Sequence, residues 1–165
     1  MTDARRRILI ACIGNIFLGD DGFGTEVARR MVLRAPLPEG VILRDFGIRS
    51  FDLTYALLEP WDLVILVDAC SRGAAPGTLY VIEPEMPAAE DTRLDAHSMS
   101  PASVLSAVRA QGGAPGKILL VGCEPADIGT DEEGKLGLSD PVMAAVDEAI
   151  AMIEHLVAEN VPQFQ

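Results

Sequence analysis

ILIACIGNIFLGDDGFG, residues 8–24, begins with an unbroken apolar run and then becomes glycine-rich and acidic. A short apolar run that ends at a glycine is typical of a strand buried on both faces of a parallel sheet. A helical pattern follows from about Phe23 to Leu33, and it would return the chain to the other end of that sheet. The stretch therefore predicts the first strand and helix of an α/β domain.

The same stretch has an alternative interpretation as a secretory signal, because Arg5-Arg6-Arg7 precedes the apolar run. No small-residue cleavage site follows, and the run ends in Gly19-Asp20-Asp21-Gly22, so we favour the buried strand. No apolar run reaches the roughly 18 residues of a membrane-spanning helix. The three cysteines show no CxxC spacing and predict neither a disulfide framework nor a zinc knuckle. We expect a cytoplasmic protein with no membrane association.

Composition narrows the class of protein further. The 165 residues, of which 49% are hydrophobic, suffice for one folded domain over 1–165 and exclude intrinsic disorder. The net charge of −12 would repel a phosphate backbone, so general nucleic-acid binding is not expected.

Strand-like and helix-like segments alternate along the rest of the chain, which is typical of α/β domains. Ser100 before Pro101 is an N-cap signal, and Ser139-Asp140-Pro141 repeats it before a long amphipathic helix. The expected strands are 8–13, 41–44, 63–67, 78–82 and 118–121, and the other expected helices are 51–58 and 101–110.

Ligands of open α/β sheets bind beyond the carboxyl ends of the strands, so we examined the residues that follow each strand. The first strand leads into 14–24, the second ends in Asp45-Phe46-Gly47, and the third ends in Asp68-Ala69-Cys70. The loop before Pro101 would bring His97 to the same edge. The other histidine, His155, is expected to be solvated on the last helix.

Two familiar α/β sites fit these residues poorly. A dinucleotide site needs GxGxxG at the first turn, but only Gly14 lies there, and Asp20 and Asp21 would occupy the phosphate position. Asp45 alone would suit a ribose. A phosphoacceptor receiver domain needs its acids directly after the first strand and a lysine after the last, where Gly122-Cys123-Glu124 stands instead.

A third interpretation takes Asp21, Asp68 and His97 as ligands of one divalent ion with open coordination positions. The mixed oxygen and nitrogen set suits nickel, zinc or manganese. Two alternatives stay open at this point. Asp21 could cap the first helix while Asp68 bonds a loop and His97 is exposed. The cysteines could be small buried residues, or Cys70 could pair with His97 as a nucleophile.

Segments spread over nearly the whole chain share a family likeness: GNIFLGDDGFG (14–24), Val67-Asp68-Ala69, Pro76-Gly77-Thr78, His97-Ser98-Met99-Ser100-Pro101, VGCEP (121–125) and Gly137-Leu138-Ser139. In this order they resemble the hydrogenase maturation endopeptidases. The resemblance implies a single three-layer α/β domain, with a twisted, mostly parallel five-stranded sheet flanked by helices.

The resemblance also implies an activity. Members of this family remove the C-terminal extension of a nickel–iron hydrogenase large-subunit precursor after nickel insertion. It assigns Asp21, Asp68 and His97 as catalytic and metal-binding residues of an aspartic-type endopeptidase. Nickel would be presented by the precursor, and other divalent metals could bind at the same site. The enzyme would act as a monomer; a chaperone that checks the nickel without cleaving is the alternative.

Two positions depart from the family pattern. Cys12 stands where glycine is common, which indicates a packing substitution. Asp45-Phe46-Gly47 replaces the more usual Asp-Gly-Gly. The substrate rim is expected to include Asn15, Asp45 and Gly47, so this second departure bears on which precursor is selected.

Overall fold

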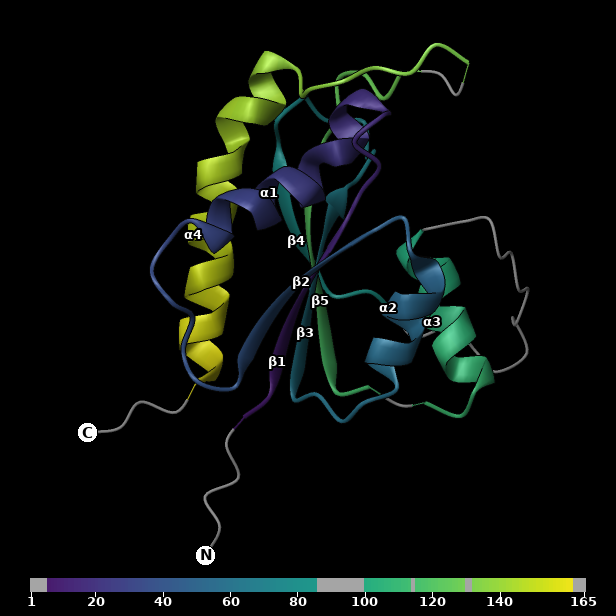
Figure 1. The fold of residues 1–165 in the computed structure, drawn as a ribbon, viewed down its shortest axis with the longest axis vertical. Coiled ribbons are helices and arrows are strands. Elements are labelled where there is room, and N and C mark those ends of the chain that lie inside the picture. Colours follow the sequence, from purple (N-terminus) through teal and green to yellow (C-terminus); the bar gives the residue numbers. More distant parts are fainter. Residues whose placement is uncertain (1–5, 86–99, 114, 130–131, 162–165) are drawn as a thin grey trace, which may run out of the picture.

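A five-stranded sheet forms the middle layer of the molecule (Figure 1). The structure is a computed structural model that describes residues 6–85, 100–113, 115–129 and 132–161. Its strand order is β2-β1-β3-β5-β4, and every neighbouring pair is parallel except β4 with β5. The strands are β1 (Ile8–Ile13), β2 (Val41–Gly47), β3 (Leu63–Ala69), β4 (Leu79–Ile82) and β5 (Lys117–Cys123).

Helices cover both faces of the sheet, which confirms the predicted three-layer α/β fold (Figure 1). Buried side chains of α1 and α4 pack on one face, and those of α2 and α3 pack on the other. None of the helices in the described part of the chain is long and apolar enough to span a bilayer. The helices are α1 (Phe23–Val32), α2 (Ser50–Leu57), α3 (Pro101–Ala110) and α4 (Asp140–Asn160), and a short 3-10 helix, η1 (Gly19–Gly22), precedes α1.

β1 is buried along its whole length, as its apolar run predicted. Alternate residues face opposite layers, so Ile10 and Cys12 pack toward α1 and α4 while Leu9 and Ala11 pack toward α2 and α3. Cys12 is fully buried, and its burial strongly raises the pKa of its thiol. The side chain is therefore a packing residue, as the sequence indicated.

β2 extends three residues beyond the predicted strand, because its pairing with β1 continues through Asp45 to Gly47. A bulge between Cys12 and Ile13 shifts the register, so that Ile13 lies opposite Gly47 rather than Phe46. Asp45-Phe46-Gly47 therefore forms the end of the second strand, as predicted from the sequence.

The chain order within the sheet creates a crevice between two strands. From β1 the chain passes to β2 on one side, and it then returns to β3 on the other side of β1. The connections after β1 and β3 therefore diverge, and such a switch point is where open α/β sheets bind ligands. Gly24 lets α1 begin directly against both strands, because an added Cβ would lie 2.2 Å from the carbonyl oxygen of Ile13 and 2.5 Å from that of Val67.

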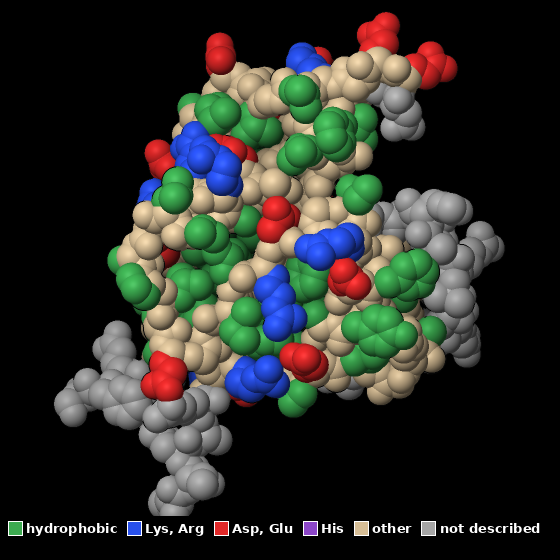
Figure 2. Space-filling view, viewed as in Figure 1, with side chains coloured by type: hydrophobic (Ala, Val, Ile, Leu, Met, Phe, Trp, Pro, Cys, Tyr) green, Lys and Arg blue, Asp and Glu red, His purple; other side chains and the backbone are tan. Residues whose placement is uncertain are grey.

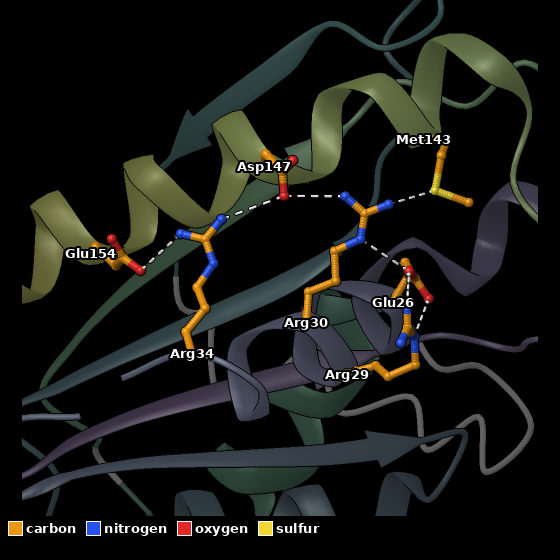
Figure 3. Close-up of polar contacts among 7 residues, drawn as sticks. All are labelled: Glu26, Arg29, Arg30, Arg34, Met143, Asp147 and Glu154. Carbon is orange, nitrogen blue, oxygen red and sulfur yellow. Dashed lines mark hydrogen bonds and ion pairs between the residues drawn. The ribbon is translucent and has the colours of Figure 1, made fainter. Parts of the chain in front are cut away.

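Charged side chains join α1 to α4 on the visible face of the molecule (Figures 2 and 3). The Arg30 guanidinium lies 3.1 Å from Glu26 on its own helix and 3.1 Å from Asp147 on α4. Arg34 lies 3.4 Å from both Asp147 and Glu154. Half-exposed ion pairs of this kind are screened by solvent, so they orient the helices more than they stabilise them.

Replacing Asp147 by asparagine should therefore have a small effect. We expect a loss of less than about 1 kcal/mol of unfolding free energy, because the carboxylate is 67% exposed. Thermal unfolding at low and high salt measures this loss, which should shrink as salt screens the pair. A loss that is large and independent of salt would show that the contact stabilises the fold by packing instead.

Candidate functional site

The loop after β1 folds back on itself and fixes the carboxylate of Asp21. The Asn15 N–H donates to the Asp21 carbonyl oxygen at 3.2 Å and to its Oδ2 at 3.1 Å. Gly14 permits this approach, because an added Cβ would lie 2.3 Å from the Asp21 carbonyl oxygen. Asp21 does not cap α1, whose N-cap is Gly22 without a side-chain cap. The helix-capping alternative for Asp21 is therefore wrong.

Asp68 lies at the carboxyl end of β3, on the other side of the switch point from Asp21. Its side chain is nearly buried, and burial raises the pKa of this carboxyl to about 8, with the charge of Asp21 adding to the effect. The Asp21 pKa is also raised by burial, against the hydrogen bond from Asn15. The fold thus brings two of the predicted ligands together in a poorly solvated place, where both carboxylates cannot easily be ionised.

His97, the third predicted ligand, lies outside the described residues. Within the part of the chain that the structure describes, no group of three or more His, Cys, Asp and Glu side chains could hold a metal ion. The carboxylates of Asp21 and Asp68 supply hard oxygen donors that fit a divalent cation, but they make only part of a ligand set.

Asp20 is the acidic residue whose role the sequence did not reveal. It is fully buried and accepts four hydrogen bonds: from the N–H groups of Ala126, Asp127 and Ser139 at 2.8, 3.0 and 2.7 Å, and from the Ser139 hydroxyl at 2.8 Å. Burial opposes ionisation, but these bonds outweigh it and lower the pKa of Asp20. Asp20 therefore clamps the loop that carries Asp21 to the loop before α4.

The Ser139 side chain bonds Asp20 instead of capping α4. This residue is the N-cap of α4 by position, but its side chain makes no capping bond to the helix. The hydroxyl donates to Asp20 instead. The predicted capping role holds for Ser100, which accepts a hydrogen bond from the N–H of Ser103 at 3.2 Å, and it is wrong for Ser139.

Glu124 has a matching role after β5, which sequence reasoning also missed. Its buried carboxylate accepts bonds from the Tyr80 hydroxyl at 2.7 Å and from the N–H groups of Arg72 and Gly73 at 2.8 and 3.1 Å. The Tyr80 bond, followed by the backbone bonds, lowers the pKa of Glu124. Glu124 thereby holds the loop that follows Asp68, so each of the two carboxylates of the site has an acidic residue that anchors its loop.

The residues predicted for the substrate rim lie together. Asn15, Asp45 and Gly47 border one cavity of about 220 Å³ beside the loop after β1. Asp45 Oδ1 accepts bonds from the Gly47 N–H at 2.9 Å and from the Thr25 hydroxyl at 3.3 Å, which links β2 to α1. That these residues contact a substrate stays a prediction.

The remaining candidates behave as ordinary structural residues. All three thiols are free, and burial disfavours their thiolates: it raises the pKa of Cys123 to about 12 and also raises that of the half-buried Cys70. A thiolate nucleophile gains no support here, and its proposed partner His97 is outside the described residues. His155 is exposed and pairs with Glu159 at 3.0 Å, as expected for a solvated helix position.

Comparison with known proteins agrees with this architecture. The family model described as hydrogenase maturation protease matches residues 25–156. The hydrogenase 2 maturation protease of Escherichia coli (strain K12) is 31% identical over 155 residues, covering 93% of this chain and 92% of its own. The hydrogenase expression/formation protein HupM of Azotobacter chroococcum mcd 1 is 34% identical over 162 residues, covering 97% of this chain and 76% of its own.

Among solved structures, the hydrogenase maturating endopeptidase HybD from E. coli superposes with a TM-score of 0.75 and 31% identity, over 93% of both chains. The chain therefore belongs to the hydrogenase maturation protease family.

Proposed function

We propose that this protein is the endopeptidase that removes the C-terminal extension of a nickel–iron hydrogenase large-subunit precursor once nickel has been inserted. Asp21 and Asp68, together with His97, would contact the nickel that the precursor presents. The enzyme would act as a monomer in the cytoplasm. Membership of the protease family supports the reaction class.

The observation that carries the proposal is the pairing of Asp21 with Asp68 at the switch point. Burial and mutual repulsion disfavour two ionised carboxylates there. A divalent cation removes this penalty by neutralising both, so the free protein is poised for a cation that arrives with its substrate. The anchors of the two loops, Asp20 and Glu124, hold the pair in place before the substrate binds.

The chain's own groups have defined tasks in this scheme. The N–H bond from Asn15 to Oδ2 orients the Asp21 carboxylate and favours its ionised form, against burial, which raises its pKa. Asp68 keeps its proton near neutral pH and gives it up when the cation binds. A bound divalent ion would polarise the scissile carbonyl or lower the pKa of an attacking water.

The intact mass of the large subunit tests the proposal. The precursor is co-expressed with this protein and the remaining maturation machinery, with and without nickel in the medium. We expect the C-terminal peptide to be lost only when nickel and this protein are both present, and to be retained with Asp21→Asn. Asp147→Asn is the matched control and should process normally. Binding without any change of mass would instead make the protein a chaperone that checks nickel without cleaving.

Processing should depend on pH through Asp68. Below a pKa of about 8 its proton competes with the cation, so kcat/KM for the nickel-loaded precursor should rise with pH, reach half its limit near pH 8 and level off above it. Initial rates are measured from roughly pH 5.5 to 9 for the wild type and for Asp147→Asn. The two proteins should show the same dependence of kcat/KM on pH. A flat profile through this range would mean that Asp68 does not titrate during the reaction.

A further inference from the structure

β2 is an edge strand whose outer side pairs with no other strand of the described chain. The Ile8 N–H donates to the carbonyl oxygen of Gly40 at 3.0 Å, so the even-numbered residues at the start of β2 direct their backbone groups to β1. Backbone groups alternate in direction along a strand. The N–H and carbonyl groups of Leu43 and the N–H of Asp45 therefore point outward, away from β1.

Arg49 marks the end of this open edge. Its guanidinium donates to the carbonyl oxygen of Asp45 at 2.6 Å and to that of Phe46 at 3.1 Å. At the other end, the Val41 N–H is bonded to the Pro38 carbonyl oxygen. The outward-facing groups between these two ends are therefore the ones available to a further strand.

A groove of about 420 Å³ runs along the open edge, between β2 and α2. Arg44 lies in it without a hydrogen bond or ion pair to any described residue, and the 65% exposed Tyr55 of α2 forms part of its wall. Figure 2 shows blue and red side chains along the middle of this face, with green ones beside them. Arginine and tyrosine are enriched where proteins bind partners. The groove is lined by Arg44, Asp45, Phe46, Arg49, Asp52, Tyr55, Ala56 and Glu59.

The groove leads to the candidate site. Asp45 borders it and also borders the 220 Å³ cavity at the rim, so the two hollows adjoin around the end of β2. The cavity also touches Asn15, whose N–H holds Asp21. Large apolar side chains stand exposed around this cavity: Ile16 at 48%, Phe17 at 62% and Ile48 at 60%.

We propose that the C-terminal segment of the hydrogenase precursor binds here in extended form, as a sixth strand on the outer edge of β2. This proposal rests on the proposed function. The outward groups of Leu43 and Asp45 would bond the backbone of the segment, as in other strand additions to a sheet edge. Arg44 would face an acidic side chain or the terminal carboxylate, because it is a cation that pairs with none of the described residues on a protein of net charge −12. An apolar side chain of the segment would occupy the rim cavity.

Charge reversal of Arg44 tests the partner chemistry. Arg44→Glu should raise KM for the nickel-loaded precursor about tenfold with kcat nearly unchanged, because a rim charge affects binding more than chemistry. Lys117→Glu changes the net charge equally at the exposed start of β5, at the opposite end of the sheet, and should leave KM unchanged. Intact-mass progress curves give both constants.

Hydrogen exchange tests the added strand itself. Binding of the precursor should slow exchange at the amides of Leu43 and Asp45, and it should leave those of β4, the other edge strand, unchanged. The strand addition would be overturned if the wild type cleaves normally but exchange in β2 does not change on binding and Arg44→Glu leaves KM unaltered. The proposed function would still stand in that case. The charges of β2 would then serve only to protect the edge from aggregation. If the wild type neither binds nor cleaves the precursor, both proposals fail.

Discussion

Asp68→Asn is expected to slow precursor processing severely and, at the same time, to make the protein more stable. Loss of one carboxylate from the pair should slow processing on the order of a thousandfold, as removal of a positioned acid or base does. Burial and the nearby charge of Asp21 raise the pKa of Asp68 to about 8, so the folded state disfavours its ionised form. A neutral amide of the same shape avoids that cost.

The sign of the stability effect depends on pH. An acid whose pKa rises on folding contributes stability that is present below its unfolded pKa and is lost as pH rises toward the folded value. At pH 7 the variant should therefore gain roughly 2–4 kcal/mol, or about 4–16 °C in Tm. Near pH 4 the wild-type carboxyl is protonated in the folded protein and about half protonated in the unfolded chain, so most of the difference is lost and the two melting temperatures should nearly converge.

Thermal unfolding at pH 4 and pH 7 measures this difference, and Asp147→Asn is the control that should show no gain at either pH. Normal processing by Asp68→Asn would remove Asp68 from the site. Equal stability of variant and wild type at pH 7 would show instead that the carboxyl is ionised in the free protein.

Asp20→Ala should have the largest destabilising effect. The substitution removes the buried carboxylate that accepts bonds from the N–H groups of Ala126, Asp127 and Ser139 and from the Ser139 hydroxyl. Hydrogen bonds to a charged group contribute more than neutral ones, and four are lost together, so we expect a loss of about 3 kcal/mol, with Tm lower by roughly 6–12 °C. Processing should also fall, because the loop that carries Asp21 loses its clamp.

Two further variants separate the clamp from a general effect of charge. Ser139→Ala removes only the hydroxyl bond to Asp20 and should cost about 1 kcal/mol. Asp140→Ala removes the exposed carboxylate of the residue after Ser139 and should change the free energy of unfolding by less than about 0.5 kcal/mol. If Asp20→Ala is no less stable than Asp140→Ala, the four hydrogen bonds do not hold the two loops together.

Wild-type stability should also fall in acid through Asp20. The pKa of this carboxyl is lower in the folded protein than in the unfolded chain, so its contribution is present above the unfolded value of about 4 and is lost as pH falls through the folded value. Asp20→Ala should lack this part of the acid transition, and acid titrations monitored by circular dichroism compare the two.

The sequence by itself determined the fold class and most of its elements. The apolar run of β1, the capping signal of α3 and the helical period of α4 are local patterns, and local patterns fix which segments become strands or helices. They also indicated that the residues after the strands would share one edge, because parallel strands end on the same side. The apolar run of the second strand stops at Arg44, and how far the strand continues toward Gly47 depends on its pairing with β1.

Only the tertiary structure decided the different roles of the acidic residues Asp20 and Asp21. Asp20 and Asp21 are adjacent and look equivalent in sequence, but one is bonded to residues more than a hundred positions away and the other lies near Asp68. Ser139 carries a helix-cap signal, yet its hydroxyl bonds the clamp. The physical reason is that hydrogen bonds and charge repulsion act between groups that only the folded chain brings together, whereas hydrophobic period and capping act within a few residues.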